Sequence, residues 1–433
     1  MKSSFTSEKQ KIIGQFSQYV SKGKADFFKT YNMDFVMGLR DGPTIQDIDG
    51  EKNLINLHCN GGVFNLGHRN PELINLLKSS LDELDIGNHH LMSQERAKLA
   101  RKIAELMPGD LEITVFGVSG GEAVDLALKT ARAATKRQEI ISASGGYHGH
   151  TGLALSAGDS EYITPFGDRL PGFTQVQFGD ISALTKQISN NTAAVILETV
   201  PATSGIIVPD KSYLKEVRRL CDLYDVILIL DEVQTGLGRT GKLWAFEHFG
   251  IIPDIVVLGK GLSGGLYPIT ATVLSKKLAS VFEENPFSHI STFGGSELGC
   301  RIATRVLDIS SNPEFLKNVN KLSDLFETKL SKLRKKYPSF FINYRGLGLM
   351  MGLMLRDETA GPVLTKTAFD EDLLLVYANN DTSVCQFLPP LNLDESIIDD
   401  IMDKLDRAMN SARKLRVLLN AKKTFSRWRT RTS

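Results

Sequence analysis

The sequence predicts an α/β fold with a large, mostly parallel sheet between helices. Residues 226–230 and 255–258 are short apolar runs rich in Val, Ile and Leu, which is typical of strands buried on both faces. A helical pattern over residues 211–225 leads into the first run, so helices and strands alternate. Asp231 directly follows the first run, and Lys260 follows the second after Gly259.

The carboxyl ends of these two strands are expected to open on one cleft, because ligands of open α/β sheets bind outside the carboxyl ends of the strands. Asp231 and Lys260 would then point into that cleft. A carboxylate and an amine suit a pyridine-aldehyde cofactor: the lysine holds the aldehyde as a Schiff base, and the acid keeps the ring nitrogen protonated. On this stretch alone, a structural ion pair is the alternative.

The composition indicates a cytoplasmic protein without an obvious macromolecular partner. The chain has 433 residues, 42% of them hydrophobic, and can bury a large core in two or three domains. Its net charge of +1 favours neither nucleic acid nor membrane. Four cysteines without paired spacing argue against a metal site or disulfide framework and for a reducing compartment. We expect no secretory signal, and no apolar run approaches the roughly 18–20 residues that span a bilayer.

The N-terminal region begins with an amphipathic arm at residues 8–22. Its apolar residues recur near helical spacing, and we expect them to pack on this chain or on a twin subunit. These residues are Ile12, Ile13, Phe16, Tyr19 and Val20. Residues 44–57 predict a hairpin, with Asp49-Gly50 as the turn signal.

A strand, a turn and a helix are predicted between residues 113 and 136. Residues 113–118 are the strand, Ser119, Gly120 and Gly121 fall in the turn, and residues 123–136 form the helix. Free backbone N–H groups collect at a helix N-terminus, so the turn is a candidate phosphate site. Small residues also make tight strand–helix turns, and the motif alone leaves both interpretations open.

A second glycine-rich loop is predicted after the strand that begins at residue 140. It carries Tyr147, His148 and His150. An aromatic side chain there would stack on a flat cofactor ring, or the segment is a plain surface loop. A further buried strand, residues 193–198, ends on Glu198.

Toward the C-terminus, Thr292 stands before a Gly-Gly pair, where its hydroxyl would either reach a phosphate or belong to a turn. Residues 313–336 predict a long helix that leads into a second domain, 341–355 read as strand, and a helical segment ends the fold within 391–418. Residues 411–433 carry eight Lys or Arg and no acidic residue. This basic tail is interpreted as a solvated terminus or as a docking surface for an acidic partner.

Four motifs identify a family. The segments FNLGHRNP (64–71), DEVQTGLGRTGK (231–242), STFGG (291–295) and NND…PPL (379–391) resemble those of the class III pyridoxal-phosphate aminotransferases, the ornithine, GABA, acetylornithine and putrescine group. They are most similar to the motifs of the putrescine members. The resemblance covers about residues 34–410 and implies fold type I: a large domain with a mostly parallel seven-stranded sheet between helices, plus a small α+β domain from both chain ends.

The resemblance also implies domain limits and an assembly. We expect the N-terminal arm and part of the small domain at residues 1–75, the large cofactor-binding domain at 76–320, the C-terminal small domain at 321–410 and the basic tail at 411–433. The implied cofactor is pyridoxal 5′-phosphate, held in a homodimer whose subunits share the active site.

Each matched residue takes a role from the family. Lys260 would bind the aldehyde of the cofactor and later shuttle a proton, and Asp231 would pair with the ring nitrogen. Val233 and Tyr147 would pack on opposite faces of the ring. Gln234 would hydrogen-bond the phenolic oxygen of the ring.

The remaining matches concern the phosphate and the surroundings of the ring. Gly120 and Gly121, with Ser119 nearby, would hold the phosphate, and Thr292 would reach the phosphate of the other subunit. Glu198 would order the neighbourhood of Gln234 and of the ring. The expected cofactor-binding residues are Ser119, Gly120, Gly121, Tyr147, His148, Glu198, Asp231, Val233, Gln234, Lys260 and Thr292.

Two positions depart from the family pattern. Thr203 stands where the family has the second glutamate of E-P-x-Q-G-E-x-G, and Gln386 stands where it has an arginine. In the family, the arginine binds the α-carboxylate of an amino or keto acid, and the glutamate masks it. Loss of both together is consistent, because an unpartnered charge in a closed pocket costs roughly several kcal/mol.

The predicted activity is transfer of an amino group between an amine or amino acid and an aldehyde, ketone or keto acid. At least one substrate is expected to lack an α-carboxylate, with Thr203, Gln386 and His150 setting specificity. His148 and His150 are the candidates to anchor the carboxylate of an amino donor. The alternative is an isomerase of the same fold, either an epimerase or an aminomutase. A non-catalytic relative is disfavoured, because Lys260 and Asp231 are both intact.

Overall fold

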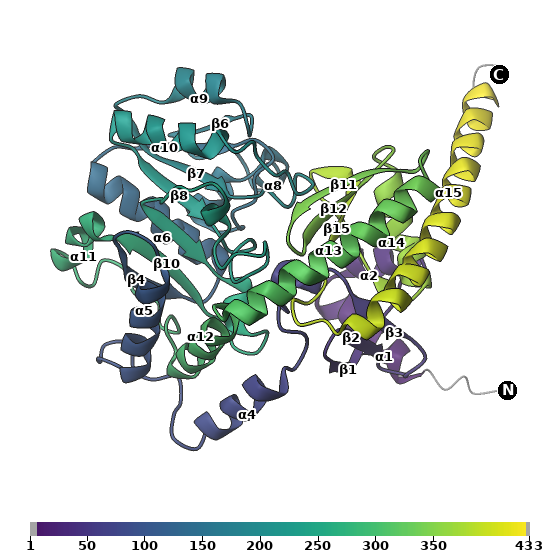
Figure 1. Ribbon diagram of the computed structural model, residues 1–433, viewed down its shortest axis with the longest axis horizontal. Coiled ribbons are helices and arrows are strands. Elements are labelled where there is room, and N and C mark those ends of the chain that lie inside the picture. The colour runs from purple at the N-terminus through teal and green to yellow at the C-terminus, as the bar shows by residue number, and fades with distance from the viewer. Residues whose placement is uncertain (1–6, 430–433) are drawn as a thin grey trace.

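The computed structural model describes residues 7–429 (Figure 1). Its strands are β1 (Met37–Asp41), β2 (Thr44–Asp47), β3 (Asn53–Asn56), β4 (Leu111–Gly117), β5 (Glu139–Ala143), β6 (Phe173–Val176), β7 (Thr192–Glu198), β8 (Ile227–Asp231), β9 (Ile255–Leu258), β10 (Thr270–Ser275), β11 (Phe341–Leu347), β12 (Met350–Leu355), β13 (Leu373–Leu374), β14 (Val376–Ala378) and β15 (Asp381–Phe387). Its α-helices are α1 (Glu8–Tyr19), α2 (Lys22–Thr30), α3 (Cys59–Gly62), α4 (Pro71–Ser80), α5 (Gln94–Leu106), α6 (Gly120–Thr135), α7 (Gly152–Ala157), α8 (Ser160–Ile163), α9 (Ile181–Gln187), α10 (Tyr213–Tyr224), α11 (Ser280–Glu283), α12 (Glu297–Ser310), α13 (Pro313–Lys336), α14 (Ala360–Asp370) and α15 (Ile398–Arg429).

A seven-stranded sheet in the order β4-β10-β9-β8-β7-β5-β6 forms the centre of the larger half of the molecule. The neighbours from β9 through β6 pair in parallel, and β10 runs antiparallel to both β4 and β9. The mostly parallel seven-stranded sheet predicted from the sequence is therefore confirmed. β7, β8 and β9 are buried along their whole length, as their apolar sequences require.

Alternate residues of these central strands enter two cores on opposite faces of the sheet. Leu228 and Leu230 pack with helices α5, α10 and α12, whereas Ile227 and Ile229 pack with α6 and α7. This alternation is the period-two pattern of strand side chains. Because both faces are covered by helices, the open approach to the sheet lies at its strand ends.

Two smaller sheets occupy the other half of the molecule (Figure 1). In the first, β3 from the N-terminal region pairs in parallel with β13 from the C-terminal region, so both chain ends contribute to one sheet. The predicted hairpin at residues 44–57 is confirmed as β2 and β3. The second sheet has the order β11-β12-β15-β14 and packs on α13, α14 and α15 around its own core.

Two local expectations need correction. Residues 341–355 are two antiparallel strands, β11 and β12, joined at Gly348, which takes a φ of +56°. Only Gly348 and Leu349 separate the two strands, so no run of turn residues marked the connection in the sequence. Helix α6 begins at Gly120 rather than at residue 123, because Ser119 accepts a hydrogen bond from the Glu122 N–H and caps the helix.

The first and last described helices, α1 and α15, lie on the smaller half of the molecule (Figure 1). The apolar side of the N-terminal arm remains open in this single chain, since Tyr19 and Val20 are exposed. Helix α15 continues through residue 410 to Arg429, so the expected boundary before the basic tail falls inside one helix. The last residues of that tail, 430–433, lie outside the described residues. Among residues 7–429, no helix is both long and apolar enough to cross a membrane.

Candidate active site

One cavity of about 320 Å³ lies at the carboxyl ends of the central strands. It brings together most of the residues that the sequence singled out. These are Ser119, Gly120, Gly121, Tyr147, His148, His150, Glu198, Asp231, Val233, Gln234 and Lys260. Thr203, Gln386 and Thr292 do not line this cavity.

Lys260 enters the cavity from the segment that follows β9. Its backbone takes a φ of +43° at the start of a 3-10 turn, which directs the chain away from the sheet. The Lys260 amine donates a hydrogen bond to Gln234 Oε1. Burial lowers the pKa of this amine to about 8, although the charges of Asp231 and Glu198 act in the opposite direction. A buried lysine with a depressed pKa is available as a neutral nucleophile near physiological pH.

Asp231 ends β8, next to β9, and is oriented by two contacts. Its Oδ2 lies 2.9 Å from His148 Nδ1, and its Oδ1 accepts a hydrogen bond of 3.0 Å from the Val233 N–H. Burial acts to lower the pKa of His148, but the hydrogen bond to Asp231 and its charge outweigh burial, so that pKa is raised. The pair is almost fully withdrawn from water, with side-chain exposures of 0% for His148 and 6% for Asp231.

The N-terminus of α6 forms a second wall of the cavity. Gly120 and Gly121 occupy the first turn of the helix, where backbone N–H groups have no partner within the helix. A side chain at Gly121 would place its Cβ 2.7 Å from Thr151 Oγ1, and one at Gly149 would meet Gly121 Cα at 2.6 Å. The lack of side chains at these glycines lets the two glycine-rich segments approach closely at the wall of the cavity.

Tyr147 stands on the loop that follows β5. Its backbone N–H donates to Glu198 Oε1 at 2.9 Å, and the Ala202 N–H donates to Glu198 Oε2 at 3.3 Å. The hydrogen bonds of Glu198 thus hold the loop of Tyr147 and the loop of Ala202. They do not include Gln234. The Tyr147 ring lies edge-on to His150 and to Tyr162, with centroid separations of 5.3 and 5.5 Å.

The family model described as aminotransferase class-III matches residues 29–409. The chain belongs to the class III aminotransferases. An uncharacterized aminotransferase of Archaeoglobus fulgidus is 52% identical to it over 411 residues, which cover 95% of this chain and 96% of that protein. A putrescine aminotransferase of Pectobacterium atrosepticum is 36% identical over 431 residues, with 94% of this chain and 92% of the relative covered.

The solved structures show the same fold. The ornithine aminotransferase of Toxoplasma gondii ME49 superposes with a TM-score of 0.86 at 25% identity, covering 94% of this chain and 96% of that one. The predicted family, fold and transaminase activity are thereby confirmed, and the family implies pyridoxal phosphate as cofactor. The comparisons give no support to the isomerase alternative.

Gln386 and Thr203, which the sequence analysis expects to set specificity, do not line the cavity. Gln386 on β15 accepts a hydrogen bond of 3.4 Å from Gln234 Nε2 and is 6% exposed. Thr203 donates through Oγ1 to the Gly145 carbonyl at 3.3 Å and accepts from the Asn380 N–H at 2.9 Å. Both positions are neutral and hydrogen-bonded.

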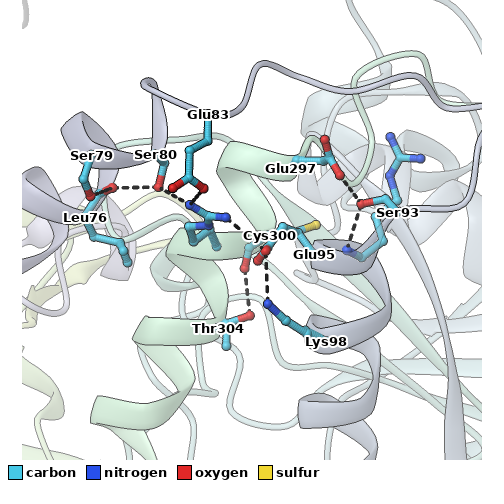
Figure 2. Close-up of polar contacts among 12 residues, drawn as sticks. Leu76, Ser79, Ser80, Glu83, Ser93, Glu95, Lys98, Glu297, Cys300 and Thr304 are labelled. Carbon is cyan, nitrogen blue, oxygen red and sulfur yellow. Dashed lines mark hydrogen bonds and ion pairs between the residues drawn. The ribbon is translucent and has the colours of Figure 1, made fainter.

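Thr292 is exposed and lies in the loop before α12. That loop is firmly held: Arg96 Nε donates to the Gly295 carbonyl at 2.7 Å, and the Ser93 hydroxyl donates to Glu297 Oε1 at 2.5 Å. Figure 2 shows Ser93 and Glu297 meeting between α5 and α12. The hydroxyl of Thr292 is thus presented at the surface on a fixed loop.

Sequence reasoning missed several residues of the site. Gly149, Thr151 and Thr235 also line the cavity, and Tyr162 adjoins its aromatic rim. Gly149 and Thr151 stand beside His148 and His150 in the same loop, so their proximity was a usable signal. Tyr162 follows this loop by more than ten residues, and no local pattern marked it.

Proposed function

We propose that this chain binds pyridoxal 5′-phosphate in the cavity around Lys260 and works as a homodimeric aminotransferase on a substrate without an α-carboxylate. The observation that carries the proposal is the convergence of a buried amine, an oriented carboxylate and a helix N-terminus on one space of about 320 Å³. The three features match the three polar parts of the cofactor: its aldehyde, its ring nitrogen and its phosphate.

The residues present fit this group by several independent observations. The pKa of Lys260 is lowered by burial to about 8, as a residue that attacks an aldehyde requires. The Nε2 atom of His148 is buried and has no hydrogen-bond partner among residues 7–429, although Nδ1 of the same ring is bound to Asp231. The glycines at 120, 121 and 149 line the cavity without side chains, and two of them lie in the first turn of α6, where a phosphate is favoured.

When bound, pyridoxal phosphate supplies an aldehyde for covalent attachment and a ring that takes up the electron pair left at the amine-bearing carbon. The chain supplies orientation and proton transfer. Asp231, held by His148 and the Val233 N–H, presents a fixed carboxylate at the floor of the cavity. The amine of Lys260 is neutral for a large part of the time near pH 8 and can accept a proton from the substrate carbon.

The proposed substrate class rests on the absence of a cation suited to a carboxylate. No arginine lines the cavity among the described residues. The neutral Gln386 stands where the family has its carboxylate-binding arginine, and Thr203 replaces the masking glutamate. A primary amine, aldehyde or ketone fits such a site by shape, and His150 at the exposed rim is the remaining candidate to meet the carboxylate of an amino donor.

The dimer, the compartment and the domain limits also belong to this proposal. Exposed Thr292 on its fixed loop and the open apolar side of α1 suit contact with a second copy. All four cysteines are free and buried, which agrees with a reducing cytoplasm. The domain limits at residues 75 and 320 are expectations from the family resemblance, and an acidic partner for the basic tail is part of the same proposal.

Covalent trapping tests the cofactor assignment. Reduction of the yellow holoenzyme with borohydride, followed by peptide mass spectrometry, should place the whole pyridoxyl mass on Lys260. A Lys260→Met variant treated in parallel should carry none. Attachment to a different lysine, or no attachment to any residue, would contradict the proposal.

A further inference from the structure

A carbonyl oxygen beside the cavity collects three side-chain donors. The carbonyl of Gly145 accepts from Ser204 Oγ at 2.7 Å, from Asn380 Nδ2 at 2.8 Å and from Thr203 Oγ1 at 3.3 Å. Thr203 and Ser204 are neighbours, 58 and 59 residues from Gly145, and Asn380 is 235 residues away, so donors from two distant segments meet at one carbonyl oxygen. Two residues later the same loop carries Tyr147 into the cavity.

The close approach at Gly145 depends on its lack of a side chain. Its backbone takes a φ of +76°, and a Cβ there would lie 2.7 Å from Ser204 Oγ. The position therefore suits glycine both by its backbone conformation and by the space available. A contact this specific holds the loop after β5 against the loop after β7.

Asn380 is the residue that joins all of these segments. It lies in the turn between β14 and β15, in the β11-β12-β15-β14 sheet of the smaller half. Its backbone N–H, Nδ2 and Oδ1 each bond a different segment of the larger half. Its backbone N–H donates to the Thr203 carbonyl at 2.9 Å, and its Nδ2 donates to the Gly145 carbonyl. Its Oδ1 accepts a hydrogen bond of 3.0 Å from the Tyr162 hydroxyl.

The contacts close a ring of hydrogen bonds. Asp159 accepts from the Gly145 N–H through Oδ2 at 2.9 Å and caps α8 by accepting from the Glu161 N–H at 3.0 Å. Helix α8 carries Tyr162, whose hydroxyl returns to Asn380. Burial raises the pKa of Tyr162 to about 12, so its hydroxyl remains a donor across the working pH range of an enzyme.

This ring of hydrogen bonds affects the active site through Tyr147. The backbone N–H of Tyr147 is bonded to Glu198, which ends β7. The aromatic ring of Tyr147 lies edge-on to the ring of Tyr162, and their centroids are 5.5 Å apart. The neighbouring His148 is bound to Asp231. A shift of the Gly145 loop therefore moves the aromatic wall of the cavity relative to the carboxylate at its floor.

The geometry points to Asn380 as a positioning residue of the active site. By bonding Gly145, Thr203 and Tyr162 at once, it fixes the position of Tyr147 at the cavity wall. It also holds the neutral segment that contains Thr203 in one conformation. This inference rests on the proposed function, because it assumes that Tyr147 faces the cofactor. It assigns a role to a residue of the smaller sheet that does not line the cavity.

Only an amide satisfies all three partners. Alanine keeps the backbone bond to Thr203 but leaves Tyr162 without its acceptor and removes one donor from Gly145. Aspartate keeps the acceptor for Tyr162 but sets a negative oxygen against the Gly145 carbonyl. Side-chain misplacement of about 1 Å can cost on the order of 10²-fold in rate, so both changes are expected to reach the chemistry.

The experiment compares holoenzyme preparations of the wild type, Asn380→Ala, Asn380→Asp and Tyr162→Phe. The first readout is the visible circular-dichroism band of the bound cofactor, which reports the asymmetry around its ring. The second is steady-state kinetics with one amine, in which kcat and KM are determined separately. We expect kcat/KM to fall about 10- to 100-fold in both Asn380 variants, with aspartate at least as impaired as alanine, together with a changed band. Tyr162→Phe should show a smaller change of the same kind.

Asn312→Ala is the matched control. Asn312 caps α13 by accepting from the Glu314 N–H at 2.9 Å and has no part in the ring, so its loss should lower the melting temperature without altering the cofactor band. If the Asn380 variants lower only the melting temperature, as Asn312→Ala does, the positioning role is wrong while the aminotransferase assignment stands. If the wild type itself binds no cofactor, the proposed function fails instead.

Discussion

Gln386 on the smaller sheet accepts a hydrogen bond of 3.4 Å from Gln234 at the cavity wall. Gln234 in turn accepts a hydrogen bond from the amine of Lys260. Two neutral amides therefore connect position 386 to the reactive amine. A charge at residue 386 would be felt directly at the site, whereas the amide leaves that side of the cavity uncharged.

Replacing Gln386 by arginine should change substrate preference. The new cation would attract an α-carboxylate, so the apparent KM for α-amino acids should fall by about tenfold or more, corresponding to roughly 1.4 kcal/mol of added binding. The KM for the matching amine without a carboxylate should rise or stay constant. Steady-state kinetics with both substrates measures the ratio. An unchanged ratio would mean that position 386 does not set specificity.

The same variant should lose stability, because the guanidinium enters a buried position without a partner. The cost is expected to be about 3–5 kcal/mol in the free energy of unfolding. Adding Thr203→Glu should restore a large part of it by supplying the missing carboxylate. Urea unfolding of the single and double variants tests this. Equal stability of the two variants would show that residues 203 and 386 do not interact.

Asp231→Asn should strongly reduce kcat but should lower the free energy of unfolding only slightly. The amide keeps the size of the carboxylate but has no negative charge to stabilise a protonated His148 or a protonated ring nitrogen. We expect a loss of about 10²–10⁴-fold in kcat. The matched control is Asp254→Asn, which removes the charge that pairs with Arg218 at 2.8 Å and with Lys277, just before β9 begins. That control should lose stability but retain kcat, and a similar kcat in both variants would contradict the assigned role of Asp231.

The buried amine of Lys260 should make the cofactor-free protein more stable as pH rises. Its pKa is lowered from 10.5 to about 8, so between these values the unfolded chain binds more protons than the folded one. The cost of burying the cation, about 3 kcal/mol, is present below pH 8 and fades toward pH 10.5. A Lys260→Met variant should therefore exceed the wild type in stability below pH 8, and the difference should shrink on going to pH 10. A constant difference would show that Lys260 does not titrate in this window.

Mixed subunits test whether the site is shared between two chains. Lys260→Ala and Thr292→Ala homodimers should each have low activity. If Thr292 serves the phosphate of the other subunit, a hybrid dimer contains one site with both residues intact. Dissociation and reassociation of a mixture of the two variants should then restore part of the wild-type activity. No recovery, with hybrids verified by native mass spectrometry, would place Thr292 outside the partner's site.

The sequence predicted the floor of the site because each reactive residue there directly follows a recognisable buried strand. Asp231 and Lys260 stand after apolar runs, and parallel strand ends meet at one edge of a sheet. The glycine-rich turn at residue 119 was recognised for a similar reason, although the helix starts earlier than its apolar pattern suggested. Two glycines obscured its first turn.

Contacts between distant segments were not predictable in this way. Asn380 and Gly145 lie 235 residues apart, and the turn that carries Asn380 has the ordinary composition of a surface turn. Its three bonds depend on how the smaller sheet sits against the larger one. The hairpin of β11 and β12 was missed for another reason, since only Gly348 and Leu349 separate the two strands and no run of turn residues marked the connection.

The most direct test of the account is a spectral titration of the yellow holoenzyme with matched pairs that differ only in an α-carboxylate, such as putrescine with ornithine and cadaverine with lysine. The loss of the visible band on conversion to the aminated cofactor is recorded against concentration. The account predicts that the amine of each pair bleaches the enzyme at a concentration at least about tenfold lower than the amino acid, a difference of roughly 1.4 kcal/mol. Bleaching at lower concentration by the amino acids, or no bleaching by any of the four, would contradict it.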